Sequence, residues 1–221
     1  MRNEAGPPSE VEERPQTRRE WAGWLRSIVL PLAVLVAIVA GLFYYEARGS
    51  GSRANGGFGT VDLPSARNVT GKAPAREVGR QAPDFLLESL DGEALRLSDR
   101  QGRPLIVNFW ATWCTPCRLE TPMLIQTYER NRGQGLVIVG VNIQEADERA
   151  RAFASEFGVS YAIVMDRRGE VAKTWRVGGA GGGLPTTYFI DSRGVTRKIV
   201  LGALQQRDLD EGLALVLGQG E

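Results

Sequence analysis

An apolar segment near the N-terminus places the strongest constraint on how this chain can fold. It runs from Ile28 to Tyr45 and contains no charged residue. Its length of about 18 residues is just sufficient to cross the ~30 Å hydrocarbon layer of a membrane as an α-helix. Trp24 before it and Tyr44 at its end stand where aromatic residues meet a membrane surface. A buried helix of a soluble protein would carry a polar stripe, which this segment lacks, so we expect a single transmembrane helix over residues 28–45.

The charges that flank this segment predict its orientation. Arginines are more frequent before it than close after it, and positively charged flanks remain on the cytoplasmic side. They are Arg14, Arg18, Arg19 and Arg26 before it, and Arg48 and Arg53 after it. We therefore expect residues 1–27 to be a cytoplasmic tail in the cell (inner) membrane, with the rest periplasmic or otherwise extracytoplasmic, where disulfides persist. A cleaved signal peptide is the alternative, but the apolar run exceeds the usual length of about 7 to 15 residues, which favours an anchor.

The remainder of the chain divides into two parts by composition. Residues 46–78 are rich in glycine, alanine and serine without hydrophobic periodicity, which is typical of a flexible linker. From 79 to 218, apolar runs alternate with amphipathic segments in the order ββ-βαβα-β-ββα. This order predicts one α/β domain with a central mixed sheet flanked by helices and an extra N-terminal β-hairpin. The expected strands include 85–87, 94–97, 104–110, 136–143, 186–190 and 195–201, and the expected helices are 114–131, 147–157 and 206–217.

Cys114 and Cys117 are the only cysteines of the chain, and they stand three residues apart. They follow a predicted strand at the start of a predicted helix, where unpaired N–H groups and the helix dipole stabilise a thiolate. Cys114 is therefore the expected nucleophile. Cys117, one turn further on, is the expected resolving thiol, which attacks a mixed disulfide at Cys114 and releases the partner.

A structural disulfide or a metal site would account for the cysteine pair less well. A structural disulfide that closes so short a loop would remove little entropy from the unfolded chain. A zinc site needs about four ligands, and the chain contains no histidine. We therefore expect neither a bound metal nor another cofactor. The net charge of +1 gives no indication of a nucleic-acid partner.

The sequence around the cysteines, NFWATWCTPCR over residues 108–118, resembles thioredoxin-like proteins. It is most similar to the TlpA/ResA/CcmG group of membrane-anchored thiol-disulfide oxidoreductases, whose domains are of the AhpC/TSA–redoxin type. The resemblance includes VGRQAPDF at residues 78–85 and GLPTTYFID at residues 183–191. It implies a thioredoxin-like fold in which a cis peptide between Leu184 and Pro185 faces the cysteine pair. A proline that merely begins an edge strand is the alternative for Pro185.

The resemblance also implies roles for individual residues. Those expected to contact the substrate are Trp113, Thr115, Pro116, Leu184 and Pro185. Glu120 stands at the spacing at which the ResA-like group carries a glutamate that tunes the thiols and moves protons; the alternative is a solvated residue of the helix surface. Thioredoxins proper have a buried aspartate where this chain has Asn108, and a lysine where it has Gly140. Glu120 is thus the expected acceptor for the proton of Cys117.

These features predict a membrane-anchored oxidoreductase that exchanges thiols and disulfides with exported proteins. The resemblance favours a reductase, with apocytochrome c in cytochrome c maturation as an expected substrate and a CcdA- or DsbD-type membrane protein as its electron donor. An oxidase or isomerase of the same fold and a Cu(I)-binding chaperone for oxidase assembly are the alternatives. A peroxidase is less favoured, because peroxiredoxins carry a threonine three residues before the reactive cysteine, where this chain has Ala111.

Overall fold

The computed structural model of the chain describes residues 30–49, 57–178 and 183–218. The chain divides into two compact units, Met1–Gly51 and Ser52–Glu221. Side chains are described for 30–40 and for all described residues from 57 onward. The predicted cytoplasmic tail, residues 1–27, lies outside the described residues.

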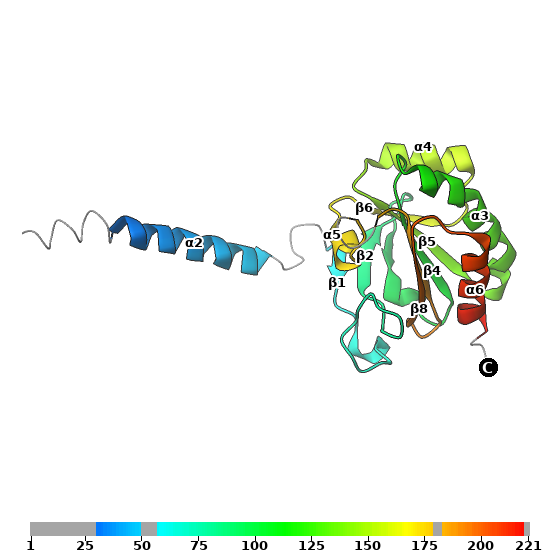
Figure 1. Cartoon of the computed structure of the whole chain (residues 1–221), viewed down its shortest axis with the longest axis horizontal. Coiled ribbons are helices and arrows are strands. Elements are labelled where there is room, and N and C mark those ends of the chain that lie inside the picture. Colours follow the sequence, from blue (N-terminus) through cyan, green and yellow to red (C-terminus); the bar gives the residue numbers. More distant parts are fainter. Residues whose placement is uncertain (1–29, 50–56, 179–182, 219–221) are drawn as a thin grey trace, which may run out of the picture. The chain divides into compact units, whose positions relative to one another are not determined.

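Helix α2, Leu30–Gly49, occupies most of the predicted transmembrane segment (Figure 1). Its described side chains, residues 30–40, are all exposed. No helix in the described part of the chain is both long enough and apolar enough to cross a membrane. Residues 28 and 29 and the side chains beyond residue 40 lie outside the described part. The membrane span over 28–45 therefore stays a prediction.

The second unit is built on a five-stranded sheet with the strand order β6-β5-β4-β7-β8. Strands β4, β5 and β6 are parallel, whereas β7 is antiparallel to β4 and β8. The bounds are Leu105–Trp110 for β4, Val137–Ile143 for β5, Ala162–Asp166 for β6, Thr186–Ile190 for β7 and Thr196–Leu201 for β8. The predicted mixed sheet is confirmed, and β4 lies at its centre.

Strand β4 is the middle strand of the sheet, and nearly all of its side chains, which point to both faces of the sheet, are apolar. All six of its residues are buried, as expected for a strand that is covered on both sides. It pairs in parallel with β5 and antiparallel with β7, so that Asn108 lies between Gly140 and Thr187. This register determines which side chains meet beneath the cysteines.

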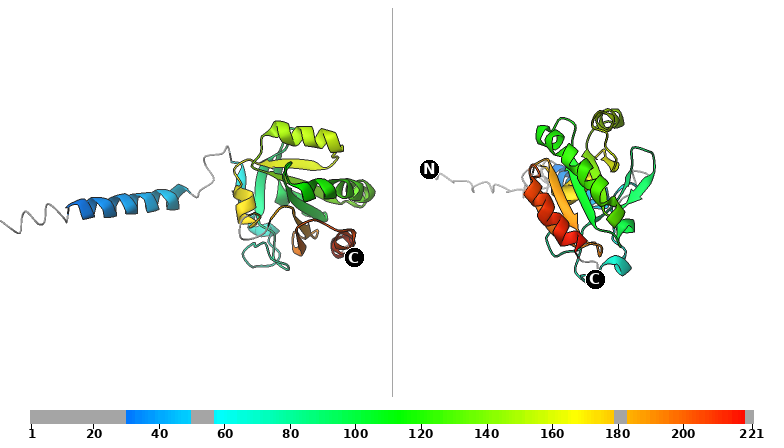
Figure 2. Two further views of the ribbon diagram at one scale, coloured as in Figure 1. Left: turned by 45° about the horizontal axis from the view of Figure 1, so that its top comes forward. Right: turned by 90° about the vertical axis from the view of Figure 1, so that its right-hand side faces the viewer.

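Helices and a second sheet cover the two faces of the central sheet, as Figures 1 and 2 show. One core contains buried residues of α3 and of α4 and α6, together with Trp110 and both cysteines. The other contains residues of the β1-β2-β3 sheet and of α5. The helix bounds are Thr115–Asn131 for α3, Asp147–Phe157 for α4, Glu170–Thr174 for α5 and Gln206–Leu217 for α6; the second sheet has Gly59–Val61 for β1, Asp84–Glu88 for β2 and Ala94–Arg96 for β3.

Residues 57–78 differ from the predicted linker. Strand β1 pairs with β2, and a 3-10 helix follows at Ser65–Arg67. The prediction of a flexible segment over 46–78 is therefore wrong for this part, and the ordered domain begins well before residue 79. The short helix α5 also lacked a predicted counterpart, because five residues carry too little periodicity to indicate a helix.

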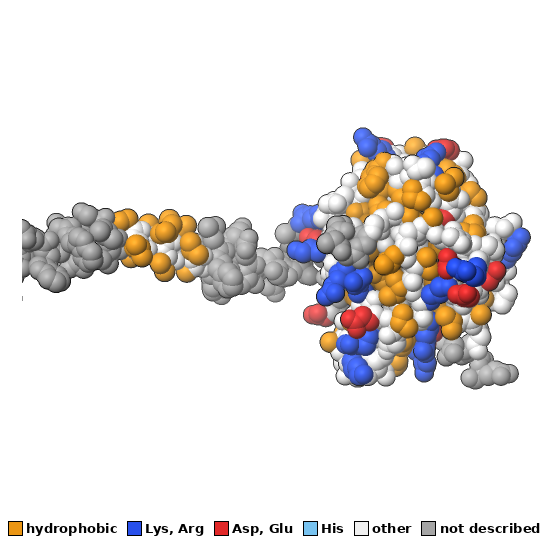
Figure 3. Space-filling view, viewed as in Figure 1, with side chains coloured by type: hydrophobic (Ala, Val, Ile, Leu, Met, Phe, Trp, Pro, Cys, Tyr) orange, Lys and Arg blue, Asp and Glu red, His pale blue; other side chains and the backbone are white. Residues whose placement is uncertain are grey.

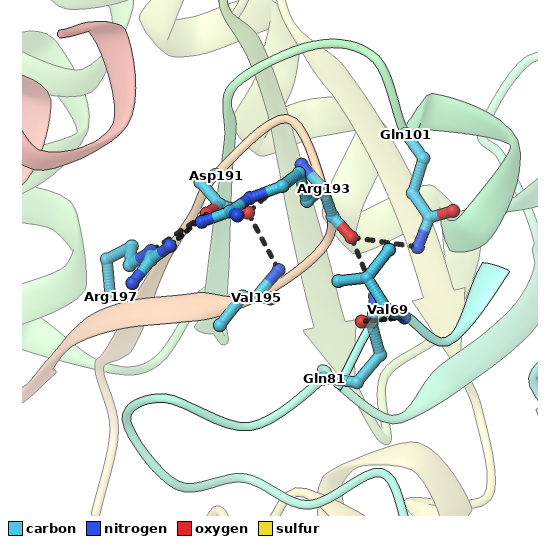
Figure 4. Close-up of polar contacts among 7 residues, drawn as sticks. All are labelled: Val69, Gln81, Gln101, Asp191, Arg193, Val195 and Arg197. Carbon is cyan, nitrogen blue, oxygen red and sulfur yellow. Dashed lines mark hydrogen bonds and ion pairs between the residues drawn. The ribbon is translucent and has the colours of Figure 1, made fainter. Parts of the chain in front are cut away.

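Polar contacts fix this N-terminal segment to the turn between β7 and β8 (Figure 4). The Gln81 amide accepts a hydrogen bond from the Val69 N–H and donates one to the Arg193 carbonyl. The fully buried Asp191 carboxylate accepts from the N–H groups of Arg193 and Val195 and holds the turn in place. The bond from Gln81 to Arg193 joins residues that lie more than 100 positions apart, so composition alone could not reveal it.

Gly212 allows α6 to lie directly against β7. A Cβ atom at this position would come within 2.3 to 2.6 Å of three ring carbons of Phe189, which is fully buried. Overpacking costs about 1 to 3 kcal/mol and alanine gains ~1 kcal/mol over glycine in a helix, so we expect Gly212→Ala to lower the free energy of unfolding by up to about 2 kcal/mol. Urea denaturation of the purified chain measures this difference. Gly133→Ala is the control, because a Cβ there meets nothing within 4 Å; equal losses for both variants would contradict the close packing.

Candidate functional site

Cys114 and Cys117 form a disulfide at the point where the central strand passes into helix α3. Strand β4 ends at Trp110, and Cys114 caps the N-terminus of α3 by accepting a hydrogen bond on its sulfur from the Cys117 N–H at 3.3 Å. Both sulfur-bearing side chains are nearly inaccessible, with exposed fractions of 4% for Cys114 and 1% for Cys117.

The cap position explains why Cys114 would be reactive once the disulfide is reduced. The first N–H groups of a helix lack intrahelical acceptors, and the helix dipole places positive potential at this end. Both effects stabilise a thiolate at Cys114. Cys117 lies inside the first turn of the helix and does not occupy the cap position, although both cysteines belong to the same buried cluster. The assignment of Cys114 as nucleophile and Cys117 as resolving thiol stays a prediction.

Glu120 lies one turn after Cys117 and is buried, with only 3% of its surface exposed. The alternative of a solvated helix residue is therefore wrong. Its carboxyl group accepts a hydrogen bond from the Asn108 amide at 2.8 Å and one from the Leu204 N–H at 2.7 Å. Among the described residues, no arginine or lysine forms an ion pair with it. Burial raises the pKa of Glu120 from 4.5 to about 7, although both hydrogen bonds lower it.

The residues that pair with Asn108 in the sheet explain why Glu120 has no cationic partner among the described residues. Gly140 pairs with Asn108 in the sheet. A Cβ atom on Gly140 would lie 3.0 Å from Nε1 of Trp110 and 3.2 Å from the ring of Tyr161. The two aromatic rings thus occupy the space that a lysine side chain would need. The result is a buried carboxyl group surrounded by uncharged groups.

The residues predicted to meet a substrate lie around the disulfide in two groups. Trp113 is 69% exposed, and Thr115 is also exposed, while Pro116 is half-buried in the first turn of α3. On the neighbouring strand, the peptide between Leu184 and Pro185 is cis, as predicted. Leu184 packs against both hydrophobic core clusters, one of which contains the two cysteines, and the role of these residues in substrate contact stays a prediction.

Glu145 is a buried site residue that the sequence did not single out. Its carboxylate accepts hydrogen bonds from the N–H and the hydroxyl of Thr112, at 2.7 and 2.6 Å, and from the Asn142 amide at 2.8 Å. Thr112 belongs to the loop that leads to Cys114, so these bonds fix the loop from the end of β5. The sequence did contain a signal for Glu145. Adjacent parallel strands end at the same edge of a sheet, so residues that follow β5 are expected beside those that follow β4.

The surface of the domain carries charges of both signs. On the face shown in Figure 3, basic and acidic side chains lie side by side around apolar areas. Elsewhere in the described part of the domain surface, ion pairs join such groups, for example Arg167 with Glu88 and with Asp147. In the described part of the chain, no group of three or more acidic or cysteine side chains is arranged to hold a metal ion.

Comparison with known proteins agrees with this arrangement of fold and disulfide. Residues 78–199 match the model of the AhpC/TSA family. The thiol-disulfide oxidoreductase ResA of Geobacillus thermodenitrificans is 39% identical over 136 residues, which cover 62% of this chain and 76% of the relative. ResA of Bacillus subtilis is 33% identical over 138 residues, covering 62% and 75%. A thiol:disulfide interchange protein of Chlorobium tepidum superposes with a TM-score of 0.57 at 28% identity, covering 66% of this chain and 99% of that one.

The raised pKa of Glu120 predicts a specific dependence of stability on pH. The folded state holds a proton on this group up to about pH 7, whereas the unfolded chain releases it near pH 4.5. Stability from this group is therefore complete below pH 4.5 and is lost as pH rises towards 7. The expected loss has an upper limit of about 3 kcal/mol.

Glu120→Gln tests this dependence because glutamine retains the size of the side chain and cannot ionise. Urea denaturation of the disulfide form between pH 4 and pH 8 should show a smaller decline with pH for Glu120→Gln than for the wild type. Glu148→Gln, at an exposed position of α4, should behave as the wild type. Parallel curves for the wild type and Glu120→Gln would contradict the raised pKa.

Proposed function

The chain belongs to the AhpC/TSA family, and from this premise we propose that it is a membrane-anchored reductase of disulfides in exported proteins. Its activity as a thiol-disulfide oxidoreductase follows from the thioredoxin-like fold, the redox disulfide and the similarity to ResA. The direction of electron flow, the location and the partners are the proposed part. The redox disulfide at the N-terminus of α3 and the similarity to ResA carry the proposal, and the buried carboxyl group of Glu120 supports exchange chemistry in either direction.

The proposed reaction consists of two thiol-disulfide exchanges. The Cys114 thiolate attacks a target disulfide, which forms a mixed disulfide and releases the first target thiolate. Cys117 then attacks the sulfur of Cys114, which closes the Cys114–Cys117 disulfide and releases the second target thiolate. Two electrons pass to the target, and each released thiolate takes a proton from water.

Glu120 suits the second exchange because Cys117 must lose its proton before it can attack. A general base is most useful when its pKa lies near the working pH, and the pKa of Glu120 is about 7. The hydrogen bonds from Asn108 and Leu204 keep the carboxyl group in place. In the reverse half-reaction, when a donor reduces the disulfide, the same group would return the proton to Cys117.

The proposed partners are an electron donor and a set of target proteins. Its two cysteines hold one pair of electrons, so another protein must supply electrons for each turnover. We propose a membrane donor of the CcdA or DsbD type, and exported proteins such as apocytochrome c as targets. Support for the membrane setting comes from the apolar segment Ile28 to Tyr45 and the basic residues before it.

The direction of electron flow can be tested by redox titration of the purified chain against glutathione. A reductase should have a midpoint potential more reducing than about −200 mV. A potential near the −120 mV that is typical of the oxidase DsbA would contradict the proposal. Strong Cu(I) binding without reduction of insulin disulfides would instead favour a copper chaperone.

The targets can be identified by trapping. In Cys117→Ser, Cys114 can still attack a target disulfide but the mixed disulfide cannot be resolved, so we expect covalent complexes on non-reducing gels that disappear on reduction. Cys114→Ser is the matched control and should trap far fewer partners, because the remaining thiol is buried with 1% exposure. Equal trapping by both variants would contradict the assigned order of attack.

A further inference from the structure

Arg118, the residue after the second cysteine, is held by side chains of helix α4. Its guanidinium group lies 5.4 Å from the ring centre of Phe153 and 4.9 Å from that of Phe157. It also donates a hydrogen bond to the Glu156 carboxylate at 2.5 Å. Although its side chain is 38% exposed, these three contacts fix the position of the charge.

The same helix also holds the strand that leads into the redox loop. The ring of Trp110, the last residue of β4, lies 4.5 Å from that of Phe153, and Phe153 stacks on Phe157 at 4.4 Å. Both ends of the segment that carries the cysteines therefore contact one pair of aromatic rings. Movement of Arg118 relative to Cys114 is restricted as a result.

The position of Arg118 in helix α3 is electrostatically unfavourable by itself. A cation in the first turn of a helix opposes the positive end of the helix dipole. The contacts with two aromatic rings and a carboxylate offset this cost. Arg118 stands four residues after Cys114, and its backbone N–H donates to the Cys114 carbonyl at 3.1 Å, so the backbone of Arg118 belongs to the turn that Cys114 caps. A cation retained at such a place adds to the positive potential that favours a Cys114 thiolate.

We infer that Arg118 is a positioning residue whose cation, held on Phe153 and Phe157, stabilises the Cys114 thiolate and so shifts the thiol–disulfide equilibrium towards the dithiol. Glu156 reduces this effect because its carboxylate partly neutralises the guanidinium charge. The inference rests on thiol-disulfide exchange at Cys114, and it holds for either direction of electron flow.

The sign of each contribution follows from the two redox states. The disulfide and two glutathione molecules give the dithiol and one glutathione disulfide, so two electrons and two protons enter the protein. Only the reduced protein can carry a thiolate at Cys114, and a nearby cation stabilises only that state. Removing the cation should therefore favour the disulfide, whereas removing Glu156 should favour the dithiol.

The test is the equilibrium constant of the purified full-length chain with glutathione at pH 7 and low salt. We expect Arg118→Met to shift it towards the disulfide by about two- to fivefold, the range for one charge near a helix end. Arg118→Lys should restore most of the wild-type value, and Glu156→Gln should shift the equilibrium in the opposite direction. All shifts should shrink at 1 M salt, where the screening length is about 3 Å.

Arg167→Met provides the matched control, because Arg167 is similarly exposed at 41% and also joins two segments through carboxylates. It should leave the equilibrium constant unchanged. A purely structural role of Arg118 predicts instead that Arg118→Met and Glu156→Gln, which break the same ion pair, shift it in the same direction. That result, or equal shifts in Arg118→Met and Arg167→Met, or no shift in any variant, would overturn the inference. Should Arg118→Met not fold, Glu156→Gln decides alone by the direction of its shift.

Discussion

The pairing of β4 between β5 and β7 determines the geometry of the whole site. Because the strand is hydrogen-bonded along both edges, the positions of Asn108 and Trp110 are fixed by two neighbours at once. Asn108 then meets Glu120, and the chain leaves the sheet after Trp110 directly into the cap of α3. A strand that was free on one edge could shift its register, which would exchange inward and outward side chains.

Two electrostatic environments lie within one helical turn of each other. Cys117 and Glu120 are enclosed by uncharged groups, so a proton rather than a counter-ion balances charge there. Cys114 lies at the N-terminus of the helix, where unpaired N–H groups and, by our inference, the cation of Arg118 favour a negative sulfur. The position within the first turn of the helix, rather than exposure, separates the nucleophile from the resolving thiol.

The sequence was sufficient to predict those elements whose evidence is local. The apolar runs predicted β4 and β5, the amphipathic pattern predicted α4 and α6 with their observed bounds, and the resemblance predicted the cis peptide before Pro185. The course of residues 57–78 was not predictable, because it depends on strand pairing with β2 and on hydrogen bonds to the Asp62 and Arg67 carbonyls from residues more than 30 positions away. The burial of Glu120 and the role of Glu145 likewise depend on which neighbours surround a carboxyl group, and a single sequence does not specify those neighbours.

The confinement of both cysteines to one turn has a consequence for biogenesis. With two cysteines in the whole chain, only one intramolecular pairing exists, so oxidative folding cannot trap a scrambled isomer. Because the bridge joins residues three positions apart at the N-terminal end of one helix, it removes little entropy from the unfolded chain. The stability of the fold therefore depends little on the bond that is made and broken in each catalytic cycle.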